Sequence, residues 1–206
     1  MLFYLLRHGE SVANVTHTFA SRKLDLPLTE TGFEQARQIA GPMKTLGFTK
    51  IYSSPLIRAQ QTADIIGDVC KLNPIITEEL REVDVGILDG KCIEEYDRQK
   101  IYDEVIGKWN IGQYKICFQN GENLIDVKNR IDKILNIIDN TDQKVLVVGH
   151  GLLFMAFIWL FCDNHGSKYN NGRINRCHYS IIENCNGRFQ ILEHDIAPEN
   201  SEKGKY

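Results

Sequence analysis

The sequence lacks an apolar run long enough to cross a membrane. The longest nearly unbroken run, residues 152–162, is about half the length of a membrane-spanning helix, which needs roughly 20 apolar residues. The apolar segment at residues 1–6 meets Arg7 before it could form the core of a signal peptide. We therefore expect a soluble, cytoplasmic protein that has no membrane partner.

An excess of basic residues is also missing. The chain carries 24 Lys and Arg against 27 Asp and Glu, a formal net charge of −3, which argues against a general nucleic-acid binder. Any site that binds an anion must therefore be local. No feature of the sequence indicates an oligomeric state.

The cysteines lack the spacing of a zinc site or a disulfide framework. None of the six forms a C-x-x-C pair; they lie at positions 70, 92, 117, 162, 177 and 185. We expect free thiols in a reducing compartment, and we expect no metal or other cofactor.

Repeats, low-complexity tracts and linkers are absent as well, which predicts one domain over residues 1–206. Three apolar runs of strand length are typical of strands covered on both faces of a parallel sheet: residues 2–6, 50–52 and 144–148. Three segments have helical periodicity: residues 30–46, 57–71 and 122–138. We predict a hairpin at the sheet edge from two short segments on either side of Asn186-Gly187, residues 179–182 and 189–192. This alternation predicts an α/β fold with a mostly parallel sheet.

Residues 86–121 interrupt the alternation. The part at 92–106 has a helical pattern, whereas the rest, with Trp109, Tyr114 and Phe118, shows no clear period. We expect an insertion that folds back over one end of the sheet. The alternative is a long disordered loop, against which the aromatic residues argue.

Cationic and imidazole side chains follow three of the predicted strands. Arg7 and His8 follow the first, Arg58 follows the second after a turn, and His150 follows the third. Ligands of open α/β sheets bind at the carboxyl ends of the strands, so these four side chains should converge. Arginine forks and helix N-termini suit a phosphoryl dianion. The sequence therefore predicts a phosphate site in an acidic protein.

The same residues resemble the motifs of the histidine phosphatase superfamily, also called the phosphoglycerate mutase-like family. The resemblance extends over about residues 2 to 195 and rests on several motifs in order. These are Arg7-His8-Gly9-Glu10-Ser11 with Asn14, Asp25-Leu26-Pro27-Leu28-Thr29 with Gly32 and Gln35-Ala36, Ser53-Ser54-Pro55-Leu56 with Arg58-Ala59 and Gln61-Thr62-Ala63, Leu80-Arg81-Glu82 with Gly86 and Asp89-Gly90, Gly121-Glu122 with Arg130, and Val147-Val148-Gly149-His150-Gly151.

The resemblance implies a three-layer α/β/α sandwich with a helical cap, and catalysis through a phosphohistidine without a metal. It implies that His8 is the nucleophile and Glu82 the proton donor, with Asp84 as the alternative acid. A charged His150 would stabilise the transferring phosphoryl group together with two arginines. The expected phosphate and substrate contacts are Arg7, Arg58, His150, Asn14, Ser11 and Gly151.

Two departures from the family pattern bear on the substrate. Arg22 and Lys23 occupy a loop where relatives usually have a glycine, so they either bind a second acidic group or face solvent. Residues 83–86 replace the Arg-His-Tyr-Gly run of phosphoglycerate mutases, which favours a hydrolase of a small phosphorylated metabolite. A phosphoglycerate-type mutase and a non-catalytic phospholigand-binding module are the alternatives.

Substrate choice should depend on the insertion, because the strand-end pocket contacts the phosphoryl group that all substrates share. We expect apolar walls from Trp109, Tyr114 and Phe118, and a charge contact from Lys108 or Lys115. The alternative is that these aromatic residues pack the insertion against the body.

Overall fold

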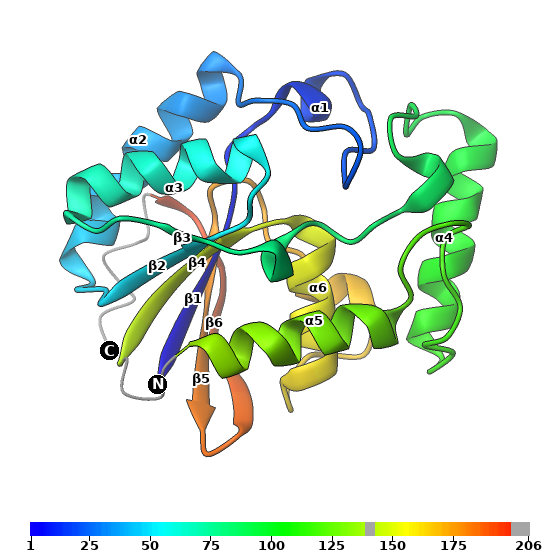
Figure 1. Ribbon diagram of the computed structural model, residues 1–206. Helices are drawn as coiled ribbons and strands as arrows, with labels where there is room; N and C mark the ends of the chain where they lie inside the picture. The colour runs from blue at the N-terminus through cyan, green and yellow to red at the C-terminus, as the bar shows by residue number, and fades with distance from the viewer. Residues whose placement is uncertain (139–142, 199–206) are drawn as a thin grey trace.

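The computed structural model describes residues 1–138 and 143–198. Within these residues, six strands form one sheet in the order β3-β2-β4-β1-β5-β6 (Figure 1). Neighbouring strands pair in parallel from β3 to β1, whereas β5 is antiparallel to both β1 and β6. The strands are β1 (Leu2–Arg7), β2 (Lys50–Ser53), β3 (Ile75–Ile76), β4 (Lys144–Gly149), β5 (Tyr179–Cys185) and β6 (Arg188–Ile196).

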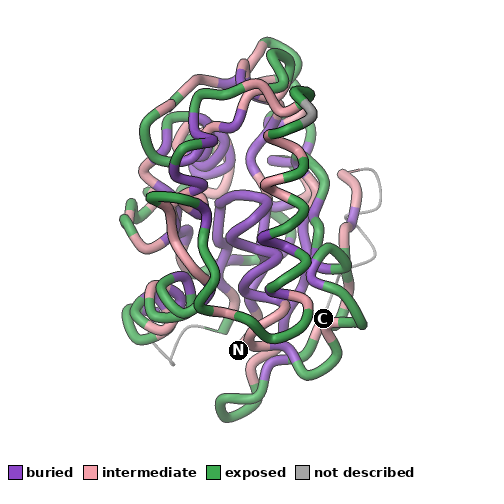
Figure 2. The backbone as a smooth tube through the Cα atoms, turned by 90° about the vertical axis from the view of Figure 1, so that its right-hand side faces the viewer, coloured by how far each residue is buried: buried purple, intermediate pink, exposed green. Residues whose placement is uncertain are grey.

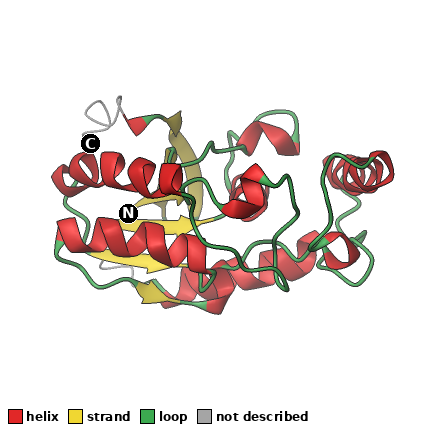
Figure 3. Cartoon of the chain, turned by 90° about the horizontal axis from the view of Figure 1, so that it is seen from above, coloured by secondary structure: helices red, strands yellow, loops and turns green. Residues whose placement is uncertain are grey.

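Helices cover both faces of the sheet, so that the strands lie between two helical layers (Figure 3). The helices α2 (Glu30–Thr45) and α3 (Ile57–Cys70) pack on one face. The helices α5 (Leu124–Ile137) and α6 (Gly151–Phe161) pack on the other. The expected three-layer α/β/α sandwich with a mostly parallel sheet is confirmed.

The unbroken apolar run of β1 follows from burial on both faces. Phe3 and Leu5 point into the core beneath α5 and α6, and Tyr4 and Leu6 point into the core beneath α2 and α3. All four are at most 1% exposed, and the buried parts of the chain lie in the interior in Figure 2. A strand with two buried faces has no place for the polar residues that a one-sided sheet would show.

Capping residues set the helix starts close to their expected positions. The Thr29 hydroxyl accepts the Gly32 N–H at 3.1 Å, and the Asn123 side chain accepts the amides of Ile125 and Asp126. The C-terminal hairpin is longer than predicted, because β5 and β6 extend to Cys185 and Ile196. No helix in the described part of the chain is long and apolar enough to span a membrane.

The insertion folds over one end of the sheet, as expected, but its helix lies further along the chain than predicted. The helix α4 covers Tyr96–Asn110, because Cys92 is already paired with Thr18 in an isolated β-bridge. The Phe19 N–H donates to the Lys91 carbonyl at 2.9 Å beside this bridge. The base of the insertion is thus tied to the loop that follows α1 (Val12–Val15).

Trp109 belongs to α4 rather than to an irregular segment. It is fully buried, with its ring 5.7 Å from that of Phe118 and 5.5 Å from that of Tyr169. The Trp109 indole N–H donates to the Ile116 carbonyl at 2.7 Å. These contacts join the insertion to the short 3₁₀ helix η3 (Tyr169–Gly172), which follows α6.

Candidate active site

The predicted site residues converge at the carboxyl ends of β1, β2 and β4. Arg7 pairs with Gly149 across the parallel ladder, so His8 and His150 follow neighbouring positions of adjacent strands. Their ring centroids lie 5.2 Å apart. Beside them a cavity of about 410 Å³ opens beneath α4, a volume in the usual range for small-molecule sites.

Hydrogen bonds fix the His8 ring in one tautomer. Its Nδ1 lies 2.6 Å from the Gly9 carbonyl oxygen, which can only accept, so Nδ1 carries the proton. The Arg58 Nε–H donates to the His8 Nε2 at 3.2 Å, so Nε2 carries no proton and has a lone pair. Burial, followed by the charges of Arg58 and Arg7, holds the pKa of His8 well below its usual range. His8 is therefore a neutral imidazole with its nucleophilic nitrogen defined.

Two arginines lie beside His8, Arg58 buried and Arg7 half-buried, and neither uses all of its donor positions. Arg58 donates from Nη2 to the Ala20 carbonyl at 2.9 Å, and Arg7 donates from Nη1 to the Ile174 carbonyl at 3.0 Å. Within the described residues, Arg7 Nε and Arg58 Nη1 have no hydrogen-bond acceptor. Burial lowers the pKa of Arg7 to about 10, against the opposing charge of Glu82. The Arg58 Nη1 also lies 3.8 Å from the Asp25 Oδ1, in an ion pair. Guanidinium donors without a hydrogen-bond acceptor fit an anion at this position.

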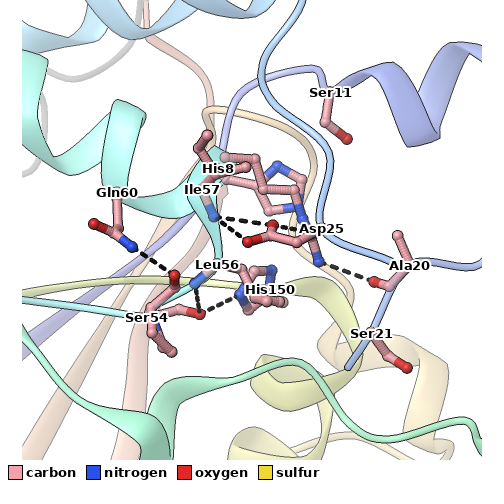
Figure 4. A network of polar contacts seen from close by, with 12 residues as sticks. His8, Ser11, Ala20, Ser21, Asp25, Ser54, Leu56, Ile57, Gln60 and His150 are labelled. Carbon is pink, nitrogen blue, oxygen red and sulfur yellow. Dashed lines mark hydrogen bonds and ion pairs between the residues drawn. The ribbon is translucent and has the colours of Figure 1, made fainter. Parts of the chain in front are cut away.

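His150 lies behind His8 and does not line the cavity. Its Nε2 is 2.7 Å from the Ser54 hydroxyl, and Figure 4 shows the two side chains together. Its buried Nδ1 has no partner among the described residues. Burial, with the nearby charge of Arg58, holds the pKa of His150 well below its usual range. In the free protein burial and Arg58 oppose the expected charge on His150, whereas a bound dianion would favour its protonation.

Glu82 lines the cavity, and its carboxylate is held by the first turn of α6. Its Oε1 accepts the Leu153 N–H at 2.9 Å and the Val83 N–H at 2.9 Å, and its Oε2 accepts the Leu152 N–H at 3.2 Å. These helix-start amides were expected to face the phosphate, and they hold Glu82 instead. The alternative acid, Asp84, is not in the cavity lining and accepts the Gly86 N–H at 2.8 Å.

Ser11, Asn14 and Gly151 also line the cavity. The Asn14 Oδ1 accepts both the N–H and the hydroxyl of Ser11, at 3.0 and 3.1 Å. A Cβ on Gly151 would lie 3.2 Å from the Arg7 Cζ, so the missing side chain leaves room for the guanidinium. These positions are consistent with their expected place around a phosphoryl group.

Arg22 and Lys23 do not line the cavity. Their backbone amides donate to the Asp89 carboxylate at 2.8 and 2.6 Å, beside the Ser21 N–H at 3.1 Å. The Arg22 guanidinium lies 3.7 Å from Asp84 and is largely exposed. The structure therefore does not bring these two side chains to the expected substrate position.

We predict that Asp89→Asn lowers the free energy of unfolding by about 1–3 kcal/mol at neutral pH, the usual cost of losing bonds to a buried charged group. Burial raises the pKa of Asp89, but its bonds to the Lys23, Arg22 and Ser21 amides outweigh burial and lower it overall. A lowered folded-state pKa stabilises the protein above the unfolded pKa of about 4, and this contribution is lost as the pH falls through the folded value.

Urea unfolding at neutral pH and near pH 3 measures this difference, with the exposed Asp68→Asn as control. The difference in the free energy of unfolding between wild type and Asp89→Asn should shrink in acid. This role of Asp89 would be contradicted if the two proteins were equally stable at neutral pH, or if the difference in the free energy of unfolding grew in acid.

Sequence reasoning missed the groups that line the cavity away from His8. Arg173 and Asn170 come from the segment around η3, and Gln99, Tyr102 and Asp103 come from α4. The residues that were expected there do not line the cavity: Trp109, Tyr114, Phe118, Lys108 and Lys115. Trp109 and Phe118 are fully buried, so they pack the insertion against the body, which was the alternative expectation.

Comparisons with known proteins show the family of the chain. The family model for the histidine phosphatase superfamily (branch 1) matches residues 3–196. A probable phosphoglycerate mutase GpmB from Escherichia coli O1:K1 / APEC is 32% identical over 189 residues, covering 87% of this chain and 83% of the relative.

Two solved structures share the fold. The alpha-ribazole phosphatase from Shigella flexneri superposes with a TM-score of 0.75 at 23% identity over 95% of this chain and 96% of its own. A mycobacterial glucosyl-3-phosphoglycerate phosphatase gives a TM-score of 0.77 at 22% identity over 95% and 99%. With the matching family model spanning nearly its whole length, the chain belongs to the histidine phosphatase superfamily.

Proposed function

We propose that the protein hydrolyses a small phosphomonoester through a phosphohistidine on His8, without a bound metal. The observation that carries the proposal is the state of His8: a neutral ring whose Nε2 lone pair lies beside Arg58 at the wall of the cavity. A half-buried acid in the same cavity, Glu82, has a use in catalysis that simple binding would not require.

In the first step the phosphoryl group replaces the Arg58 Nε–H as the partner of the His8 Nε2. The Nε2 lone pair forms the N–P bond, and the P–O bond to the alcohol breaks. Arg7 and Arg58 bind the phosphoryl oxygens, where negative charge is spread in the transition state. Glu82, protonated at this stage, gives its proton to the departing alkoxide.

In the second step the Glu82 carboxylate takes a proton from water. The oxygen of this water forms the new P–O bond, the N–P bond breaks, and inorganic phosphate leaves. His8 returns to its neutral state and Glu82 to its protonated one, so the cycle is closed. Neither step needs a cofactor.

A phosphoglycerate-type mutase is the second candidate, because relatives such as the E. coli protein are named probable phosphoglycerate mutases. The residues after Glu82 favour hydrolysis. Val83 and Val85 are buried in the core, and Asp84 is engaged by Gly86 and Arg22, so this segment offers no donor to retain a phosphorylated product. Incubation with phosphoglycerates separates the two activities: hydrolysis releases free phosphate, whereas a mutase yields isomerised product.

The leaving alcohol should contact the cavity residues from α4 and the η3 segment. Of these, Arg173 is a cation whose charge contributes to the lowered pKa of Arg7, after burial and against Glu82. We predict that Arg173→Gln lowers kcat/KM for esters with an anionic alcohol roughly 10- to 100-fold more than for esters with a neutral one.

The matched control is Arg176→Gln, which removes a nearby exposed cation that does not line the cavity and that lies 3.3 Å from Glu10. The substrate pair is 3-phosphoglycerate and glycerol 3-phosphate, which differ by a carboxylate in place of a hydroxymethyl group. Equal losses on both esters, or the same change in Arg176→Gln, would exclude a direct contact with Arg173.

A further inference from the structure

The segment that carries Glu82 is not held by the sheet. Glu82 lies between two 3₁₀ turns, η1 (Glu78–Leu80) and η2 (Gly86–Leu88), and pairs with no strand in the described part of the chain. Its carboxylate accepts two amides of α6 and the Val83 N–H, but these contacts hold the side chain and not the backbone. The backbone needs a separate support if the carboxylate is to stay at one point of the cavity.

Arg130, on the second turn of α5, provides support on the N-terminal side of Glu82. Its Nη1 donates to the carbonyls of Glu79 and Arg81, at 2.7 and 3.1 Å. Its Nε and Nη2 form a two-pronged ion pair with Glu122, at 2.7 and 2.8 Å. Both side chains are about four-fifths buried, at 18% and 20% exposure. One guanidinium thus ties the chain before Glu82 to the start of α5.

Glu122 provides the support on the C-terminal side. Its Oε2 accepts the Asp84 N–H at 2.9 Å, and its own backbone N–H donates to the Asp84 carbonyl at 2.9 Å. The Ile87 N–H also donates to the Gln119 carbonyl at 2.9 Å. Glu82 is therefore bracketed by anchored residues on both sides.

Two glycines allow the backbone of residues 84–87 to approach that of residues 119–122. A Cβ on Gly121 would lie 2.3 Å from the Asp84 oxygen, and a Cβ on Gly86 would lie 2.0 Å from the Gln119 oxygen. Gly86 also has a φ of +57°, in the left-handed region. The segment can reach Glu122 at this distance because neither position carries a side chain.

We propose that the Glu122–Arg130 pair positions Glu82 for proton transfer. This inference rests on the proposed function, since it assigns the pair a role in the leaving-group step. Neither residue lines the cavity, so each acts through Glu82 and not by touching substrate. Small displacements of a catalytic group are costly: an error of about 1 Å can reduce a rate by roughly 10²-fold.

The test compares two esters of similar size with different needs for protonation, benzyl phosphate and p-nitrophenyl phosphate. In Glu122→Gln and in the milder Arg130→Lys, the ratio of kcat/KM for benzyl to p-nitrophenyl phosphate should fall roughly 10- to 100-fold. The control is Lys128→Gln, which breaks an exposed ion pair with Asp132 on the same helix. This control should leave the ratio unchanged.

A double-mutant cycle separates positioning from general damage. Adding Glu122→Gln to Glu82→Gln should lower the ratio no further, because the group that the pair positions is already gone. Thermal unfolding of each variant reports any loss of stability. The inference would be overturned if this ratio were unchanged in both Glu122→Gln and Arg130→Lys. It would also be overturned if Glu122→Gln lowered the ratio in the Glu82→Gln background as much as it does in wild type. If wild type hydrolyses neither ester, the proposed function itself fails.

Discussion

His8→Ala should lose turnover by on the order of 10⁴-fold or more, because under the proposed mechanism it removes the atom that forms the bond to phosphorus. The variant should still fold. His8 follows the end of β1 and lines the cavity, and it is not part of either hydrophobic core. Release of phosphate from p-nitrophenyl phosphate measures turnover, and thermal unfolding measures the fold.

The control for this variant is His194→Ala. His194 lies on β6, where its Nδ1 is 2.9 Å from the Ser180 hydroxyl, and it does not line the cavity. His194→Ala should retain wild-type turnover. If His8→Ala turned over as fast as wild type, His8 could not be the nucleophile.

Glu82→Gln should slow benzyl phosphate roughly 10²- to 10⁴-fold, the usual contribution of a general acid, and slow p-nitrophenyl phosphate far less. The reason is the leaving group. The p-nitrophenolate ion can depart without a proton, whereas the benzyl alkoxide needs the proton that Glu82 would donate. The glutamine keeps the size of the side chain and an oxygen that can accept amides of the first turn of α6. Steady-state kinetics on the two esters measures the difference.

Asp84→Asn is the matched control, because Asp84 is two positions away and outside the cavity. It should not show the selective loss. If Asp84→Asn slows benzyl phosphate selectively and Glu82→Gln does not, the proton donor has been assigned to the wrong carboxylate.

The strands and the residues at their carboxyl ends could be predicted because their signals are local. Strands buried on both faces appear as apolar runs, and β1 and β4 both show one directly before Arg7 and His150. The Thr29 cap marked the start of α2, whereas the start of α5 was predicted two residues too early. The hairpin was predicted too short because β6 continues through Glu193, His194 and Asp195, where no apolar pattern remains.

The far side of the cavity could not be predicted because it depends on contacts between distant segments. Trp109 could have faced a substrate or the core, and its burial against Phe118 and Tyr169 decided for the core. Arg173 follows a short 3₁₀ helix with no periodic signal. The contact of Glu82 with the start of α6 joins positions about 70 residues apart, and no spacing rule links them.

Direct identification of the phosphorylated atom is the most direct test of the mechanism. The enzyme is mixed with radiolabelled or ordinary phosphomonoester, quenched in alkali because phosphohistidine is acid-labile, and digested for mass spectrometry and ³¹P NMR. Because Nδ1 donates to the Gly9 carbonyl, phosphate should appear on the Nε2 of His8 and be absent from His8→Ala. Phosphate on another residue, on the Nδ1 of His8, or on no residue of an enzyme that is turning over would contradict the account.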